Sequence, residues 1–250
     1  MTTTIVLGDG PLGQAVGQAL RDRADAVRVM GRPIEGRHDP ATLAAAGLVV
    51  DASRADAVAS NVEVALDAGC RSFVIATTGW HADADAVGAA LRRAGAVAVA
   101  APNLALGAAL FLRLVDEAAR LAAAIGGFEP SVLEWHRRSK TDRPSGTARE
   151  IVRRLAAELP IAVDEVAVLR SGSMPGMHVV GLDGSSETIE LRLTARDRSG
   201  YASGALAAID WLRAAPRSPG IHAFDEVVDE RIAAARAVAR TRFEPVGATA

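Results

Sequence analysis

Short apolar runs alternate with amphipathic segments along the N-terminal part of the chain. The runs are rich in Val, Ile and Ala and predict buried strands, and the segments between them have the spacing of helices. The expected strands cover residues 3–7, 26–30, 48–50, 72–75 and 97–100. The first expected helix ends near residue 23, and the next two cover 55–68 and 82–93. This alternation is typical of an α/β, Rossmann-type doubly wound parallel sheet.

The pattern changes after residue 104. A long apolar helix is expected over residues 105–125, where Gly126 and Gly127 end it. Strand-like runs then follow at 131–135, 165–169, 177–182 and 187–194, with helices expected at 144–158 and 200–214 and a turn at Pro219 and Gly220. Successive strands without helices between them favour a second domain of α+β type. We therefore expect a first domain over 1–103, a second over 104–217, and a return to the first over about 218–250.

Composition excludes several classes of protein. Half of the 250 residues are hydrophobic and the net charge is −2, so a broad surface for nucleic acid or acidic membranes is not expected. A single cysteine, Cys70, excludes an intrachain disulfide and fits a reducing compartment. We see neither a signal-peptide pattern nor an apolar run of the roughly 20 residues that span a bilayer. We therefore expect a soluble cytoplasmic protein.

A glycine-rich turn follows the first strand directly and opens the first helix. Its pattern is G-x-G-x-x-G, formed by Gly8, Asp9, Gly10, Pro11, Leu12 and Gly13. In this context the glycines let a dinucleotide pyrophosphate approach the backbone, and the helix N-terminus supplies free N–H groups. An ordinary glycine-rich turn remains the alternative.

Two further strand ends favour a nicotinamide cofactor. The second strand ends at Met30 and Gly31 without the carboxylate that bonds the ribose of NAD, and Arg32 follows, which favours NADPH over NADH. Glu35 lies close enough to weaken this inference, and Arg32 as a solvated loop residue remains open. The fourth strand ends in small and hydroxyl residues that suit a nicotinamide or ribose at the sheet edge, namely Ala76, Thr77, Thr78 and Gly79.

Residues 134–148 carry the candidate chemistry and read EWHRRSKTDRPSGTA. This stretch holds Lys140, the only lysine among 28 basic residues, four positions after His136. Lysine can release a proton where arginine stays charged. A turn of Ser145, Gly146 and Thr147 then opens a helix and is suited to an anion. Chance survival of the lysine and a purely structural histidine are the alternatives.

With these residues the chain resembles the 4-hydroxy-tetrahydrodipicolinate reductase family, also called dihydrodipicolinate reductase. The family signature is close to E-x-H-H-x-x-K-x-D-A-P-S-G-T-A, which residues 134–148 match in most positions. Residues 76–79 resemble its GTTG cofactor loop, and a second pattern, R-x-G-x-x-x-G-x-H, is matched by Arg170, Gly172, Gly176 and His178. Its asparagine-containing hinge is resembled by Ala101, Pro102, Asn103 and Leu104.

The resemblance implies a specific reaction and assembly. It implies a homotetramer, held by the substrate domain, that transfers hydride from NADPH or NADH to a cyclic unsaturated imine dicarboxylate, 4-hydroxy-tetrahydrodipicolinate of lysine and diaminopimelate biosynthesis. It gives His136 the acid/base role and Lys140 the role of proton donor. The implied cofactor contacts include residues 101–104, and the implied substrate contacts are Arg137, Lys140, Ser145, Gly146 and Thr147. No metal is implied.

Four departures from the family pattern keep the substrate open. Arg137 stands for the second histidine of the signature, Arg143 for its alanine, and Leu193 for a later histidine. The glycine loop is also one residue shorter than usual. One alternative is therefore a reductase of the same fold for another cyclic imine or enamine carboxylate in specialised metabolism. The other is a nucleotide-binding regulator without turnover.

Overall fold

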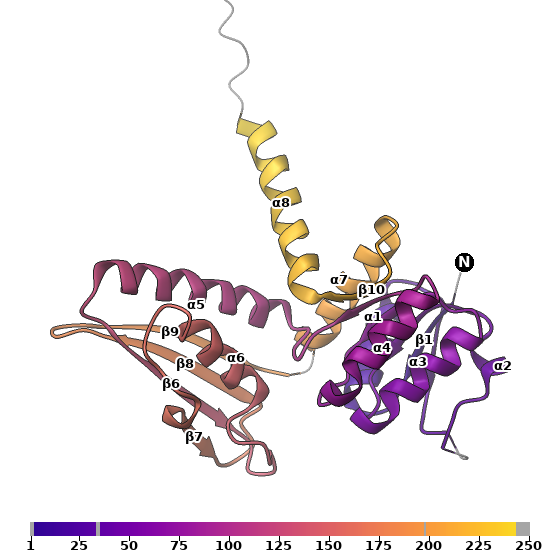
Figure 1. The fold of residues 1–250 in the computed structure, drawn as a ribbon, viewed down its shortest axis with the longest axis horizontal. Helices are drawn as coiled ribbons and strands as arrows, with labels where there is room; N and C mark the ends of the chain where they lie inside the picture. Colours follow the sequence, from indigo (N-terminus) through magenta and orange to yellow (C-terminus); the bar gives the residue numbers. More distant parts are fainter. Residues whose placement is uncertain (1–2, 34–35, 198, 244–250) are drawn as a thin grey trace, which may run out of the picture.

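The first of two sheets is parallel throughout. The computed structural model describes residues 3–33, 36–197 and 199–243, and places the two sheets side by side along the long axis of the molecule (Figure 1). The first sheet has the order β10-β5-β4-β3-β1-β2. Its strands are β1 (Thr3–Leu7), β2 (Val27–Met30), β3 (Ala46–Asp51), β4 (Ser72–Ile75), β5 (Val97–Ala100) and β10 (Gly220–Ala223). The predicted Rossmann-type architecture is confirmed.

Helices cover both faces of this sheet. One face packs against α1 (Pro11–Asp22), α7 (Ser199–Ala214) and the start of α8 (Phe224–Phe243), and the other against α3 (Val58–Asp67) and α4 (Ala84–Arg93). A short helix α2 (Pro40–Leu43) and two 3₁₀ turns, Ala55–Ala57 and His81–Asp83, complete the connections. Neighbouring residues of one strand, such as Ile5 and Val6, belong to opposite cores. Burial on both faces explains why these strands read as continuous apolar runs.

The second sheet is mixed and has the order β7-β6-β8-β9. Its strands are β6 (Glu129–His136), β7 (Ala167–Arg170), β8 (Gly176–Asp183) and β9 (Thr188–Ala195), of which β6 and β7 are parallel and the other pairs antiparallel. One face packs against α5 (Leu106–Ile125) and α6 (Gly146–Leu155), and a 3₁₀ turn, Val163–Glu165, precedes β7. Val115, Val132 and Ile151 lie in this core.

The C-terminal part departs from the sequence-based expectation in two places. Gly220, expected in a turn, begins β10, which pairs in parallel with β5 from Val97 onward. Helix α7, expected in the second domain, packs its buried residues into the core of the first sheet, where Ile209 and Trp211 lie. We therefore propose a domain boundary before α7 in place of residue 217.

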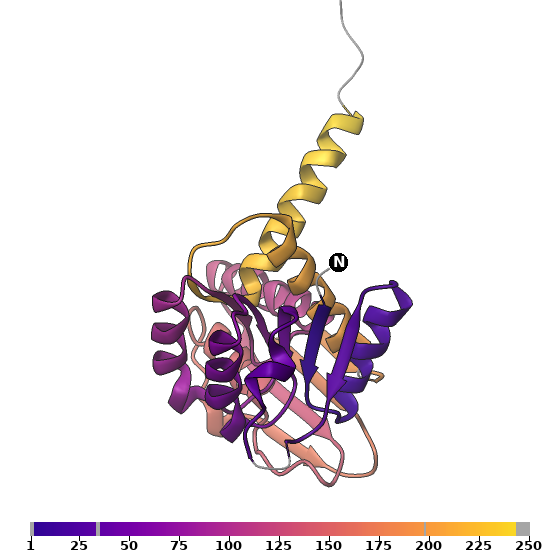
Figure 2. The ribbon, with the colours of Figure 1, turned by 90° about the vertical axis from the view of Figure 1, so that its right-hand side faces the viewer.

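Helix α8 leaves the body of the molecule after its first turns. Phe224, Val227 and Val228 are buried in the first core, whereas the remaining described side chains of the helix are mostly exposed. Its later turns project away from both sheets (Figure 2). Within the described ranges, no helix has the length and apolar character needed to cross a membrane.

Candidate functional site

The glycines of the turn after β1 meet two separate requirements. Gly8 has a φ of +110°, and a Cβ at Gly13 would lie 1.9 Å from the Gly8 carbonyl oxygen, so the turn itself requires both glycines. Gly10 differs, because a Cβ there would meet no atom within 4 Å. No side-chain cap satisfies the first N–H groups of α1 in the described part of the chain. The loop therefore fits a pyrophosphate, and the open face at Gly10 is where it would approach.

The end of β2 carries both a cation and a carboxylate. Arg32 is exposed there. A Cβ at Gly31 would come 2.7 Å from Asp9 Oδ2, so the Asp9 carboxylate lies where a side chain of the strand end would project. The strand end itself has no carboxylate, as the sequence shows, but the glycine loop brings that of Asp9 to it. Glu35, the acidic residue noted nearby in the sequence, lies outside the described residues. A ribose bound here would meet opposing charges.

A buried carboxylate holds the loop after β4. Asp51 is 2% exposed, at the end of β3. Its Oδ1 accepts hydrogen bonds from the hydroxyl of Thr77 (2.6 Å) and the hydroxyl of Ser53 (2.7 Å), and its Oδ2 from Asn61 Nδ2 (2.8 Å). Asp51 therefore fixes the loop expected to bind the cofactor. Sequence reasoning noted Asp51 only as a strand end; its position after a buried apolar run was the available signal.

Two of the expected cofactor segments share one cavity. It measures about 180 Å³, and residues from the ends of β4 and β5 line it, including Thr77, Thr78, Ala101 and Pro102. The carboxyl edge of a doubly wound sheet is the usual place for a dinucleotide. Leu104 points elsewhere, because its side chain is buried in the first core.

Asn103 joins this edge to the second sheet. Its Nδ2 donates to Thr147 Oγ1 at 3.3 Å, and its Oδ1 accepts from the backbone N–H of Ala105 at 2.9 Å. Thr147 lies in the first turn of α6, after the N-cap Ser145, whose hydroxyl accepts from the N–H of Ala148. A Cβ at Gly146 would meet no atom within 4 Å. The hinge expected at the cofactor therefore contacts the turn expected to bind a substrate anion.

A buried ion pair lies beneath that turn. The side chains of Glu134 and Arg170 are both fully buried, and Glu134 Oε1 accepts from Arg170 Nη2 at 2.5 Å and from the N–H of Ser145 at 2.9 Å. Arg170 also donates to the carbonyl oxygen of Asp142 at 2.6 Å. Burial alone would raise the pKa of Glu134, but the hydrogen bonds from Ser145 and Arg170 outweigh it and hold the pKa below its usual range.

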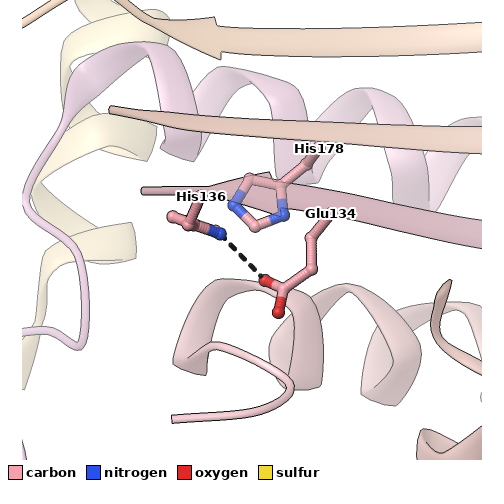
Figure 3. A group of neighbouring side chains, drawn as sticks. All are labelled: Glu134, His136 and His178. Carbon is pink, nitrogen blue, oxygen red and sulfur yellow. Dashed lines mark ion pairs between the residues drawn. The ribbon is translucent and has the colours of Figure 1, made fainter. Parts of the chain in front are cut away.

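Two histidines complete the cluster in Figure 3. His136 Nδ1 lies 3.4 Å from Glu134 Oε2, and the His178 ring meets the His136 ring edge-on with centroids 5.2 Å apart. Burial lowers the pKa of His136, with Glu134 opposing and Lys140 adding to the effect. Burial and the neighbouring His136 lower the pKa of His178 to about 4. Both rings are therefore mostly neutral at pH 7.

The same three side chains are close enough to share a metal ion. Arg170 already supplies a positive charge to the Glu134 carboxylate. The absence of a metal from the reaction stays a prediction.

The loop of residues 137–143 lies nearer the surface. Lys140 Nζ forms an ion pair with both carboxylate oxygens of Asp142, at 2.8 and 2.9 Å, and its side chain is 26% exposed. Arg137 and Arg143 are exposed on the same loop. Leu193 lies opposite His178 in the sheet and packs into the second core. The arginine substitutions therefore add charge at the rim and do not fill the interior.

Comparisons with known proteins identify the family. The family model "Dihydrodipicolinate reductase, C-terminus" matches residues 107–228. The 4-hydroxy-tetrahydrodipicolinate reductase of Myxococcus xanthus is 32% identical over 239 residues, covering 88% of this chain and 84% of its own. The chain belongs to the 4-hydroxy-tetrahydrodipicolinate reductase family. The family's enzyme from Archaeoglobus fulgidus is also 32% identical, over 80% of this chain and 81% of its own.

A solved structure agrees in fold. Dipicolinate-bound dihydrodipicolinate reductase from Paenisporosarcina sp. TG-14 superposes with a TM-score of 0.70 at 18% identity, covering 89% of this chain and 97% of that one. As a member of the reductase family, the chain is an NAD(P)H-dependent oxidoreductase with a nicotinamide nucleotide as cofactor. The predicted enzyme class is confirmed, which removes the alternative of a regulator without turnover.

The open space at Gly10 gives the first prediction. Gly10→Val should leave the free energy of unfolding unchanged to within about 0.5 kcal/mol, because no atom lies where its side chain would project. The Kd for NADPH should rise about tenfold or more, because the side chain would occupy the pyrophosphate position. Urea unfolding and fluorescence titration measure the two effects. Unchanged cofactor binding would mean that the loop is only structural.

Proposed function

We propose that this protein reduces 4-hydroxy-tetrahydrodipicolinate to tetrahydrodipicolinate in lysine and diaminopimelate biosynthesis, with NADPH preferred over NADH. The observation that carries the proposal is the hydrogen bond from Asn103 to Thr147. It joins the carboxyl edge of the Rossmann sheet to the N-terminus of α6, so a cofactor at one and a carboxylate at the other would be neighbours. Family membership supplies the reaction class.

In this proposal, the position of each residue determines its role. The Gly10 face and the cavity lined by Thr77 and Ala101 would hold the cofactor, which supplies the hydride when bound. The free N–H groups of Gly146 and Thr147 suit a substrate carboxylate, and the cations of Lys140 and Arg137 lie on the adjoining loop. A cation beside the reacting imine stabilises the charge that hydride transfer leaves, Lys140 supplies the proton, and the neutral ring of His136 is the acid/base group beside it.

A second candidate substrate is favoured by one specific observation. Arg137 and Arg143 are both exposed on the loop that carries Lys140. Two guanidiniums at a site rim can bind the carboxylates of another cyclic imine or enamine acid equally well. The reaction type and the roles of His136 and Lys140 would be the same.

We also propose a homotetramer built on the second sheet. The face of this sheet turned away from α5 and α6 exposes Leu133 (38%) and Leu169 (46%), and α5 exposes Leu110, Leu114 and Leu121. These leucines form two separate exposed apolar areas, one on the open face of the sheet and one on α5, and exposed apolar areas of this kind favour association. Sedimentation velocity tests the assembly, and the mass of a single 25.8 kDa chain would contradict it.

The substrate assignment is tested by cofactor oxidation with freshly generated 4-hydroxy-tetrahydrodipicolinate. We expect turnover within the usual range for enzymes, about 1–10³ per second. Arg137→His restores the family residue and serves as the comparison. A gain of about tenfold or more in that variant, from a slow wild type, would favour another imine acid as the native substrate. The assignment would be refuted if the protein reduced other cyclic imines but did not reduce 4-hydroxy-tetrahydrodipicolinate.

The preference between NADPH and NADH depends on two opposing charges, the guanidinium of Arg32 and the carboxylate of Asp9. We expect wild-type protein to bind NADPH more tightly than NADH, and Arg32→Ala to narrow the difference, because the guanidinium would meet the 2′-phosphate. Asp9→Asn should increase the difference between the two affinities, because the carboxylate that it removes repels the 2′-phosphate. Titration with both nucleotides measures each Kd. Equal wild-type affinities would contradict the argument.

Lys140 is tested by removing its charge. Lys140→Met should lower kcat about a hundredfold while cofactor binding holds, within the range of general acid–base groups. Lys140→Arg keeps the charge but does not release a proton, so we expect little rescue. Arg138→Met, which removes an exposed cation from the same loop, is the matched control and should retain activity. Near wild-type turnover of folded Lys140→Met would leave the residue a structural role only.

A further inference from the structure

The two oxygens of Glu134 face different partners. Oε1 accepts hydrogen bonds from Arg170 and from the N–H of Ser145. Oε2 is buried and has no hydrogen-bond partner among the described residues, and the same is true of His136 Nδ1, which lies 3.4 Å away. A buried polar atom without a partner is costly. One proton between these two atoms would satisfy both.

The two nitrogens of His136 are likewise in different surroundings. Nδ1 faces the Glu134 carboxylate in the buried cluster (Figure 3). Nε2 faces Gly176, where a Cβ would come within 3.1 Å of it. Gly176 therefore packs close to this nitrogen, and a side chain at position 176 would press on it. Unlike Nδ1, Nε2 is not among the fully buried polar atoms without a partner in the described part of the chain, so Nε2 is the nitrogen that keeps some contact with solvent.

We propose that Glu134 is a positioning residue for His136. Its Oε2 accepts a hydrogen bond from the Nδ1–H of His136, which places the single proton of the neutral ring on Nδ1 and leaves the lone pair on Nε2. A carboxylate that fixes the tautomer and the ring orientation of a histidine is a general device in catalytic and metal sites. The inference rests on the proposed function only in giving His136 the acid/base role.

The surroundings of His136 favour Glu134 over the other candidates. Arg170 from β7 and Lys140 from the following loop are cations and cannot accept a proton from Nδ1. Asp142 from that loop is paired with Lys140. His178 from β8 approaches the ring edge-on, and its own Nδ1 is also buried without a partner. His178 is therefore the competitor for Glu134 Oε2, but it is His136 that lies at ion-pair distance.

The sign of the effect on pH dependence follows from the charges. The Glu134 carboxylate raises the pKa of His136, against burial and the cations Lys140 and Arg170, which lower it. Replacing Glu134 by a neutral side chain removes the stabilisation of the imidazolium. The limb of the kcat/KM profile that belongs to His136 should then move to lower pH.

The direct test is the tautomer of His136 in wild-type protein. The chain has five histidines, so ¹⁵N-histidine labelling gives a spectrum that can be resolved, and His136→Gln assigns the signals by their loss. We expect the Nδ1–H form at pH 7. An Nε2–H form would overturn the proposal. This measurement needs no substrate, so it stands even if 4-hydroxy-tetrahydrodipicolinate is not reduced, a result that would refute the proposed function alone.

Glu134→Gln is the second test. The glutamine oxygen can still accept from Ser145 and Arg170, while its NH₂ donates to His136 Nδ1 and moves the ring proton to Nε2. We expect kcat/KM to fall about 10- to 100-fold with unchanged NADPH affinity, and the His136 limb to move to lower pH. Glu129→Gln, an exposed position on the same strand, is the matched control. A folded Glu134→Gln with the wild-type pH profile would also overturn the proposal; should it not fold, the wild-type tautomer decides.

Discussion

The substrate side of the molecule depends on one buried charge pair. Glu134 and Arg170 lie entirely out of water, a state that is costly unless every donor and acceptor has a partner. Partners come from the N-cap of α6 and from the carbonyl oxygen of Asp142, while Glu134 Oε2 and Arg170 Nε are buried without a hydrogen-bond partner among the described residues. The pair thus ties together β6, β7, the loop of residues 137–143 and the first turn of α6. Removing one partner of such a pair costs about 3–5 kcal/mol, so this geometry is rigid.

The fold was largely predictable from the sequence because its strands are buried on both faces. The runs at Thr3–Leu7, Ser72–Ile75 and Val97–Ala100 have the predicted bounds. Strand β10 was missed because its four residues, Gly220–Ala223, carry no apolar run. Its place in the sheet comes from β5, which lies far away in sequence. The placement of α7 failed for the same reason, since local periodicity does not say which sheet a helix covers.

For the candidate site, the sequence indicates residue types but not the contacts between them. The stretch from Glu134 to Ala148 pointed to His136, Lys140 and the turn at Ser145. The hydrogen bond from Asn103 to Thr147 spans 44 residues, and no spacing rule reports it. Asp51 had only its strand-end position as a signal. The role of Glu134 follows from distances alone, because only the folded chain brings its two oxygens to different partners.

The burial of each side chain in residues 134–148 also separates positions that tolerate substitution from positions that do not. Glu134, His136 and Ser145 are buried and share partners, so a substitution at one disturbs the others. Arg137 and Arg143 are exposed and hold no buried partner among the described residues. Mutations at these two arginines therefore change the free energy of unfolding little. Under the proposed function, substitutions at these arginines would change which acid is recognised at the rim without disturbing the buried cluster beneath it.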